Sequence, residues 1–137
     1  MKISLIIDIK KKLMYNVYMG NNQSSEDYLE CILLLSRESE FVHRVDVARR
    51  IGVSQPAVQK AVKLLESAGF VECNGMHIYL TEKGEKYALE IFDRHCTLTR
   101  FLQKLGVKAK EAEEDACKME HILSQASFEA IKKFLDE

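Results

Sequence analysis

The spacing of apolar side chains predicts that the chain after residue 23 is mainly helical. A first apolar stripe follows helical periodicity and consists of Tyr28, Leu29, Ile32, Leu33 and Leu35. Ser24 or Ser25, followed by Asp27 or Tyr28, is typical of the residues that cap a helix N-terminus. We therefore expect a helix that begins at this serine pair and ends at about Arg37.

Two shorter helices joined by a tight turn are predicted next. The first covers residues 44–51 and ends at Gly52. Ser54 then provides a cap, and Pro56 falls in the first turn of the second helix, where backbone N–H groups have no intrahelical acceptor. The buried stripe of this second helix is expected at Val58, Ala61, Val62 and Leu65. This pattern indicates a helix–turn–helix.

A β-hairpin is predicted directly after this helix pair. Asn74-Gly75 lies between two β-prone runs, residues 70–73 and 76–80. An Asn-Gly pair in this setting is the strongest short-range signal for a hairpin, and the expected type I′ turn has positive φ at both central residues. A hairpin at this place forms the wing of a winged helix–turn–helix.

Three further helices complete the expected fold. The first begins after Thr81 and runs to about Leu105, where Gly106 stops it, and the others cover residues 109 to about 123 and 127–135. These helices are too few and too short to form a separate globule, so we expect a dimerisation module. The predicted fold class is mainly α, with a winged helix–turn–helix over residues 24–82 followed by an α-helical module over residues 83–137.

Composition narrows the class of protein. The chain has 137 residues, of which 47% are hydrophobic and 30% charged, as in a globular protein. Its four cysteines lack C-x-x-C pairing, which argues against a zinc ribbon or a disulfide framework and indicates reduced thiols in the cytoplasm. Residues 1–18 contain neither an apolar span of the ~20 residues that a membrane helix needs nor a signal-peptide pattern. We expect residues 1–23 to be an extension outside the fold.

Basic side chains are concentrated in the predicted helix–turn–helix, although the formal net charge of the whole chain is −1. Residues 44–63 contain five arginines and lysines but a single carboxylate, Asp46. The start of the second helix would enter the major groove of double-stranded DNA. The residues expected to contact DNA are Arg44, Arg50, Ser54, Gln55, Pro56, Ala57, Gln59, Lys60 and Lys63. The alternative is a solvated basic face that contacts another protein.

Three predicted helices carry side chains that could bind a metal. Cys117, Glu120 and His121 have i, i+3, i+4 spacing, which places them on one face of a helix. Asp27 and Glu30 share a face of the first helix, and His95 lies in the long helix; together these six donors would suffice for one ion or a pair. Oxygen and nitrogen donors suit Mn(II) and Fe(II), whereas a thiolate shifts the preference toward Fe(II), Co(II), Ni(II) or Zn(II).

Each of these pieces also has a simpler interpretation. A Cys-x-x-Glu-His sequence can lie on an ordinary amphipathic surface, and the carboxylates of the first helix can stabilise its N-terminus through the helix dipole. A single histidine in a long helix is commonly a partly buried residue with satisfied hydrogen bonds. The residues alone leave these alternatives open.

Five sequence segments resemble the diphtheria toxin repressor/manganese transport regulator family of metal-dependent repressors. They occur in the family's order, over residues 24 to about 136, and are residues 25–30, 54–56, 80–84, 94–95 and 117–124. The resemblance implies a homodimer that binds palindromic operators when loaded with Fe(II) or Mn(II) and represses metal-uptake genes.

The same resemblance assigns roles to individual residues. Asp27 and Glu30 match ligands of the manganese branch, and His95, Glu120 and His121 match ligands found in both branches. Cys117 matches the thiol ligand of the iron branch, where the manganese branch has glutamate. The ancillary site of the iron branch has glutamate and histidine where this chain has Thr99 and Glu113, so that site looks degraded. The chain length resembles the manganese branch; Fe(II) is favoured, with Mn(II) a close alternative.

Three other functions are compatible with some of these features. A winged-helix regulator could sense oxidants through Cys117 or Cys96, although acidic neighbours disfavour a thiolate. The metal site could be purely structural. An enzyme with Cys117 as nucleophile and His121 as base is not expected, because both residues would sit within a helix, where no backbone N–H is available for an oxyanion hole.

Overall fold

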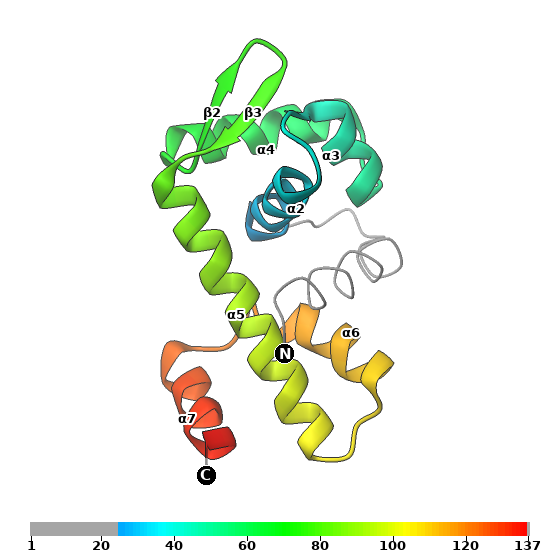
Figure 1. Cartoon of the computed structure of the whole chain (residues 1–137), viewed down its shortest axis with the longest axis vertical. Coiled ribbons are helices and arrows are strands. Elements are labelled where there is room, and N and C mark those ends of the chain that lie inside the picture. Colours follow the sequence, from blue (N-terminus) through cyan, green and yellow to red (C-terminus); the bar gives the residue numbers. More distant parts are fainter. Residues whose placement is uncertain (1–24, 137) are drawn as a thin grey trace. The chain divides into compact units, whose positions relative to one another are not determined.

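The computed structural model describes residues 25–136, which form two compact units, the first ending at Leu89 and the second beginning at Glu90. The predicted N-terminal extension and the cap at Ser24 lie outside the described residues. The elements (Figure 1) are, in chain order, α2 (Ser25–Glu38), β1 (Val42–His43), α3 (Arg44–Ile51), α4 (Gln55–Ser67), β2 (Val71–Asn74), β3 (His77–Leu80), α5 (Glu82–Lys104), α6 (Ala109–Met119) and α7 (Gln125–Asp136). Within residues 25–136, no helix is both long and apolar enough to cross a membrane.

The helix–turn–helix of the first unit is confirmed. α3 ends at Gly52, whose φ of 84° lies in the left-handed region and whose N–H donates to the Ala48 carbonyl. Ser54 caps α4, because its Oγ accepts a hydrogen bond from the Ala57 N–H at 3.3 Å. The buried residues of α4 are Val58, Ala61, Val62 and Leu65, the stripe that the sequence predicts. Local capping and apolar periodicity therefore determine this part of the fold.

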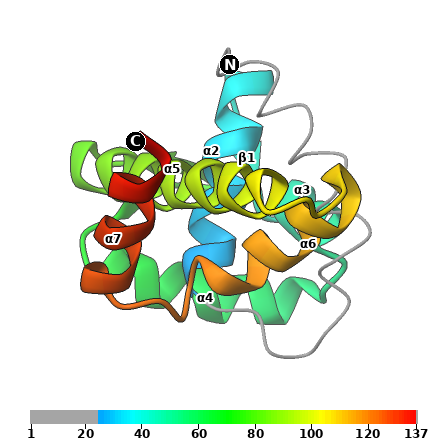
Figure 2. The ribbon, with the colours of Figure 1, turned by 90° about the horizontal axis from the view of Figure 1, so that it is seen from below.

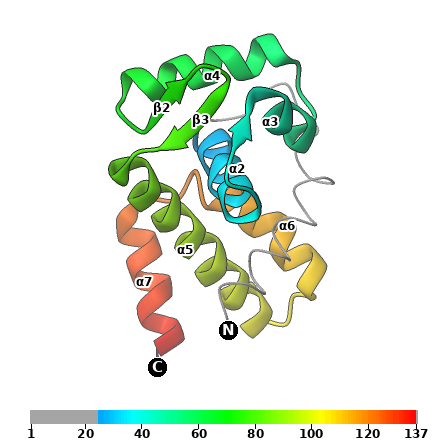
Figure 3. The same ribbon diagram turned by 45° about the horizontal axis from the view of Figure 1, so that its top comes forward.

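The wing is a three-stranded antiparallel sheet with the order β1-β3-β2, and Figure 3 shows β2 and β3 beside α4. Asn74 pairs with His77, so the two loop residues are Gly75 and Met76. The prediction of a type I′ turn centred on Asn74-Gly75 is wrong, since only Gly75 has positive φ, 63°. A single positive φ at the first loop position is the pattern of a type II′ turn. The two-residue strand β1, which the sequence analysis does not predict, pairs Val42 with Ile78.

The start of α5 is fixed against the wing. Thr81 Oγ accepts from the Gly84 N–H at 3.0 Å and donates to the Gly69 carbonyl at 2.6 Å, so Thr81 caps α5, which begins after it as predicted. A Cβ atom at Gly84 would overlap the carbonyl group of Phe70. Glycine is therefore required here by the close approach of two backbone segments. α5 continues to Lys104 and is followed by Gly106, whose φ is 102°.

The second unit consists of the part of α5 after Leu89 together with α6 and α7, which flank that part of α5 (Figure 2). α6 ends at Met119, so the prediction of a helix to about Leu123 is wrong. Residues 120–122 form a turn after Met119. The Arg94 guanidinium donates to the carbonyl oxygens of Glu120 and Leu123, both at 2.9 Å. These contacts satisfy backbone groups at the helix end in place of a further helical turn.

α7 begins earlier than predicted. Ser124 Oγ accepts a hydrogen bond from the Ser127 N–H at 3.2 Å, and the Ser124 carbonyl accepts from the Phe128 N–H. Ser124 is thus an N-terminal cap that the sequence analysis does not identify, and the helix starts at Gln125 instead of Ser127. The segment between Met119 and Ser124 is therefore a turn between two helices, and it contains Glu120 and His121.

Candidate metal centre and nucleic-acid interface

Most of the predicted DNA-contacting residues lie on the surface at α4. Ser54, Gln55, Pro56, Lys60 and Lys63 are exposed, and Ala57 and Gln59 are partly exposed. The N-terminus of α4 also presents backbone N–H groups that have no acceptor within the helix. This face of the first unit has the polar side chains and the positive charge that contact with a duplex requires.

The two predicted arginines of α3 have other environments. Arg50 is only 5% exposed and donates from Nη2 to Glu38 Oε2 at 2.6 Å, so its burial does not agree with the predicted DNA contact. Periodicity did not show this, because a long basic side chain can fold back onto its own domain. Arg44 is partly buried and lies along the wing, with Nη1 3.4 Å from the Gly75 carbonyl oxygen.

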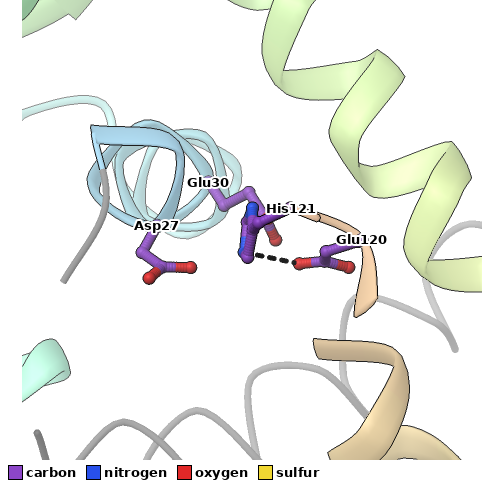
Figure 4. A group of neighbouring side chains, drawn as sticks. All are labelled: Asp27, Glu30, Glu120 and His121. Carbon is purple, nitrogen blue, oxygen red and sulfur yellow. Dashed lines mark ion pairs between the residues drawn. The ribbon is translucent and has the colours of Figure 1, made fainter. Parts of the chain in front are cut away.

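The first helix carries two buried carboxylates. Asp27 is 5% exposed and Glu30 is 1% exposed. Figure 4 shows both side chains projecting from α2. A carboxylate in a protein interior is costly unless hydrogen bonds or a cation compensate for its lost hydration. Stabilisation of the helix N-terminus does not account for Glu30, which lies beyond the first turn of α2.

Two predicted ligands of the second unit, Cys117 and Glu120, lie beside one imidazole nitrogen of a third, His95. His95 is fully buried on α5, and its Nδ1 lies 3.0 Å from Glu120 Oε2 and 3.7 Å from the Cys117 Sγ. His121 Nε2 lies 3.3 Å from the other carboxylate oxygen of Glu120, a contact drawn in Figure 4. The structure therefore brings His95, Cys117, Glu120 and His121 together within this unit.

The geometry that joins Cys117, Glu120 and His121 differs from the prediction. Glu120 is the C-terminal cap of α6. Its φ of −60° and ψ of −22° are still helical, so it keeps the i, i+3 relation to Cys117. His121 lies in the turn beyond the helix. The expectation that both Cys117 and His121 sit within a helix is therefore wrong for His121.

Thr99 and Glu113 both contact His95. Thr99 Oγ1 donates to the His95 backbone carbonyl at 2.8 Å, and Glu113 Oε2 lies 2.5 Å from His95 Nε2. Sequence reasoning treated Glu113 only as a departure from a family pattern. The available signal was its position four residues before Cys117, which places both residues on one face of α6.

Two other thiols, Cys31 and Cys73, are poorly suited to such a centre. Burial raises the pKa of Cys31 well above its usual range, and burial followed by the nearby Glu66 carboxylate raises the pKa of Cys73. Both therefore stay protonated at neutral pH, which disfavours metal binding and oxidation.

The donor set in the second unit fits a divalent transition metal. It combines the buried imidazole of His95, the buried thiol of Cys117 and the buried carboxylate of Glu120, with a second imidazole adjacent at His121. Imidazole and carboxylate suit Mn(II) and Fe(II), and sulfur extends the range to softer ions. Buried groups of this chemistry are expected to be paired with each other or bound to a metal.

Comparisons with known proteins cover both units. The family described as "Iron dependent repressor, N-terminal DNA binding domain" matches residues 22–77. The family described as "Iron dependent repressor, metal binding and dimerisation domain" matches residues 81–137. Together these matches account for most of the chain.

Individual relatives agree with the family matches. The transcriptional regulator MntR of Escherichia coli is 41% identical over 110 residues, which are 80% of this chain and 71% of that protein. The iron-dependent repressor IdeR of Mycobacterium tuberculosis is 32% identical over 104 residues, 74% of this chain and 45% of that protein.

A solved structure shows the same fold at similar identity. The manganese regulator SloR is 32% identical and aligns with a TM-score of 0.73 over 84% of this chain and 54% of that one, so this chain spans about half the length of that structure. The fold, the sequence matches over both units and the identity to several regulators agree. The chain belongs to the diphtheria toxin repressor/manganese transport regulator family of metal-dependent transcriptional repressors.

Proposed function

We propose that this protein is a DNA-binding repressor of metal-homeostasis genes that uses Fe(II) or Mn(II) as its co-repressor. The observation that carries the proposal is the convergence of Cys117 and Glu120 on Nδ1 of the buried His95. A buried imidazole with a thiol and a carboxylate beside one of its nitrogens offers donor types that bind divalent transition metals. No catalytic role is assigned to any of them, and the matched family consists of transcriptional regulators.

The proposed ligand set extends to both units. We assign Asp27, Glu30, His95, Cys117, Glu120 and His121 to the metal centre, with Asp27 and Glu30 supplied by α2 of the DNA-binding unit. Three of these six groups are carboxylates, and Cys117 adds a fourth negative charge as a metal-bound thiolate, so the set repels itself unless a cation offsets its charge. Metal binding would therefore favour the arrangement of the two units in which all six groups share an ion. DNA that prefers this arrangement would in turn tighten metal binding.

The proposed target is double-stranded DNA with a palindromic operator, bound by a homodimer. The relevant surface is the N-terminal part of α4, where Gln55 and Lys60 are exposed and Ser54 caps the helix. In a helix–turn–helix this helix end faces base edges in the major groove, and a dimer reads two half-sites. Such a protein would act in the cytoplasm, next to the DNA that it regulates. The division into domains at residues 82 and 83 remains a prediction.

Fe(II) is the favoured metal and Mn(II) the close alternative. The relatives include an iron-dependent repressor and a manganese regulator, so the family alone does not choose. In this chain, the thiol of Cys117 lies next to His95 in the buried donor set, and sulfur favours Fe(II) over Mn(II). Co(II) and Ni(II) are also expected to bind in vitro, because the affinity of a given site generally rises from Mn(II) through Fe(II) and Co(II) to Ni(II), and Zn(II) is expected because imidazole and thiolate donors suit it.

An anaerobic gel shift on the promoter region of the protein's own gene tests the proposal. The full chain is compared in Fe(II), Mn(II), Zn(II) and chelator, with Cys117→Ala, Glu120→Ala and the exposed control Lys118→Ala. We expect metal-dependent binding for the wild type and the control. Glu120→Ala should lose the response, since a direct ligand should matter more than the ~10–100-fold typical of an outer-shell partner. Equal operator binding in metal and chelator would reject the sensor function.

The same assay addresses the choice of metal. Cys117→Glu replaces the thiol with the carboxylate found in the manganese branch, and we expect it to lower the response to Fe(II) relative to Mn(II). An unchanged ratio would show that Cys117 does not set the preference. Release of DNA by peroxide together with indifference to chelator would instead support the oxidant-sensing alternative.

A further inference from the structure

The two ring nitrogens of His95 face different partners. Nδ1 lies 3.0 Å from Glu120 Oε2 and 3.7 Å from Cys117 Sγ, two of the proposed ligands. Nε2, which points away from Nδ1 across the imidazole ring, lies 2.5 Å from Glu113 Oε2. Glu113 therefore contacts the nitrogen that the proposed metal centre leaves unused.

The contact between Glu113 and His95 is short and shielded from water. His95 is fully buried and Glu113 is 8% exposed. The 2.5 Å separation places the two groups in direct hydrogen-bond contact. An ionised carboxylate only accepts hydrogen bonds, so Glu113 can hold a proton on Nε2, while Glu120 faces Nδ1 at 3.0 Å in the same way. The Nδ1 lone pair becomes available when a metal ion takes the place of a proton between Nδ1 and Glu120, and Nε2–H can then stay bonded to Glu113.

We propose that Glu113 is the positioning residue of the metal centre: it accepts a hydrogen bond from Nε2–H of His95 and thereby holds the Nδ1 lone pair toward the ion. This inference rests on the proposed function, and it assigns to Glu113 an outer-shell carboxylate role. Metal-bound histidines commonly donate their second N–H to such a carboxylate, which fixes the tautomer and the ring orientation and raises the basicity of the ligand.

The local fold supports this role over direct coordination by Glu113. An ion bound at Nδ1 lies on the opposite side of the ring from Nε2, so a carboxylate at Nε2 is not adjacent to it. Glu113 and Cys117 are four residues apart on α6, which presents one side chain to each end of the imidazole. Thr99, the other neighbour on α5, hydrogen-bonds only the backbone of His95 and does not orient the ring.

The test compares Glu113→Ala and Glu113→Gln with Asp115→Ala in the full chain. Asp115 is an exposed carboxylate on the same helix and serves as the matched control. The first measurement is the tautomer of His95 in the diamagnetic Zn(II)-loaded protein, from long-range ¹H–¹⁵N NMR correlations. The second is the affinity for Mn(II), titrated anaerobically by calorimetry, with Co(II) absorption as a spectroscopic check.

We expect the wild type and Asp115→Ala to hold the Nε2–H tautomer and to bind Mn(II) equally well. Glu113→Ala should mix the tautomers and weaken Mn(II) binding by about 10–100-fold, the range typical of outer-shell partners. Glu113→Gln keeps the volume and an oxygen acceptor, so its loss should be smaller than that of Glu113→Ala. If Glu113→Ala does not fold, Glu113→Gln decides, because its weaker acceptor should still shift both measurements.

Two results would overturn the inference separately from the proposed function. One is unchanged Mn(II) affinity and an unchanged His95 tautomer in the Glu113 variants while the wild type binds the metal normally. The other is weakened affinity with an unchanged tautomer, which would mean that Glu113 acts only through the stability of α6. A wild-type protein that does not bind Mn(II), Fe(II) or Co(II) at all would overturn the proposed function and this inference together.

Discussion

The interiors of the two units differ in chemistry. The first unit is filled mainly by aliphatic side chains from every helix and strand, such as Ile32, Val47, Val58 and Ile78. The interior of the second unit is rich in polar groups, namely His95, Thr97, Thr99, Glu113 and Glu120. Burial of apolar surface stabilises the first interior, whereas the second depends on hydrogen bonds and charge pairs that must each be satisfied.

The two interiors therefore suit different tasks: stable folding in the first unit and a response to a cation in the second. Removing one member of a buried charged pair is strongly destabilising, because the other member remains unpaired. A polar interior is therefore a poor means of gaining stability but an effective means of responding to a cation. The exceptions in the first unit are Arg50, which pairs with Glu38, and the carboxylates Asp27 and Glu30, which belong to the proposed ligand set.

The largest effect is expected from a cavity in the apolar interior. Leu65 is 3% exposed in α4, whereas the adjacent Leu64 is 57% exposed. Leu65→Ala should lower the free energy of unfolding by about 2–5 kcal/mol. Leu64→Ala should stay within about 0.5 kcal/mol of the wild type. Urea denaturation followed by circular dichroism measures both, and equal losses would contradict the assignment of the α4 core face.

The polar interior should respond to metal instead. Mn(II) at a free concentration of 100 times its dissociation constant should raise the free energy of unfolding by about 2.7 kcal/mol, and chelator should remove this gain. His95→Gln should abolish the gain, whereas Leu65→Ala and the exposed Arg100→Ala should retain it. Thermal unfolding with and without Mn(II) tests this. A gain that persists in His95→Gln would show that the ion binds elsewhere.

The smallest expected effect is the loss of stability when a helix cap is removed. It should be equal in the two units, because a cap acts only on the end of its own helix. Ser54 Oγ caps α4 and Ser124 Oγ caps α7, with distances of 3.3 Å and 3.2 Å to the backbone N–H groups. Either serine changed to alanine should lose about 1 kcal/mol of stability. Ser67→Ala, which removes a hydroxyl bonded to the Lys63 carbonyl, should have little effect. Unequal losses at the two caps would mean that the units differ in more than their interiors.

The parts of the fold that could be predicted from the sequence are those with local causes. Gly52, Ser54 and Pro56 determine the turn between α3 and α4, and the apolar stripe of α4 follows from periodicity. The observed turn of the wing lies one residue after the predicted turn. The reason is that strand register depends on pairing with β3 as well as on Asn74-Gly75. Strand β1 has only two residues and carries no periodic signal of its own.

The candidate site was predictable in its donor types but not in its contacts. Spacing and family resemblance indicated His95, Cys117, Glu120 and His121, which the second unit brings together. The end of α6 at Met119 has no glycine or proline signal, since it depends on hydrogen bonds from Arg94 on another helix. The contact of Glu113 with His95 likewise joins two helices, and no single stretch of sequence encodes it.

Gly84 has a consequence for the evolution of this chain. Every amino-acid replacement of glycine adds a Cβ atom, and at this position the added atom overlaps the Phe70 carbonyl group. The obstacle is backbone, which cannot rotate aside as a side chain would. No single amino-acid substitution at this position can therefore be neutral in this fold. A lineage can lose Gly84 only together with changes that move the start of α5 away from the wing.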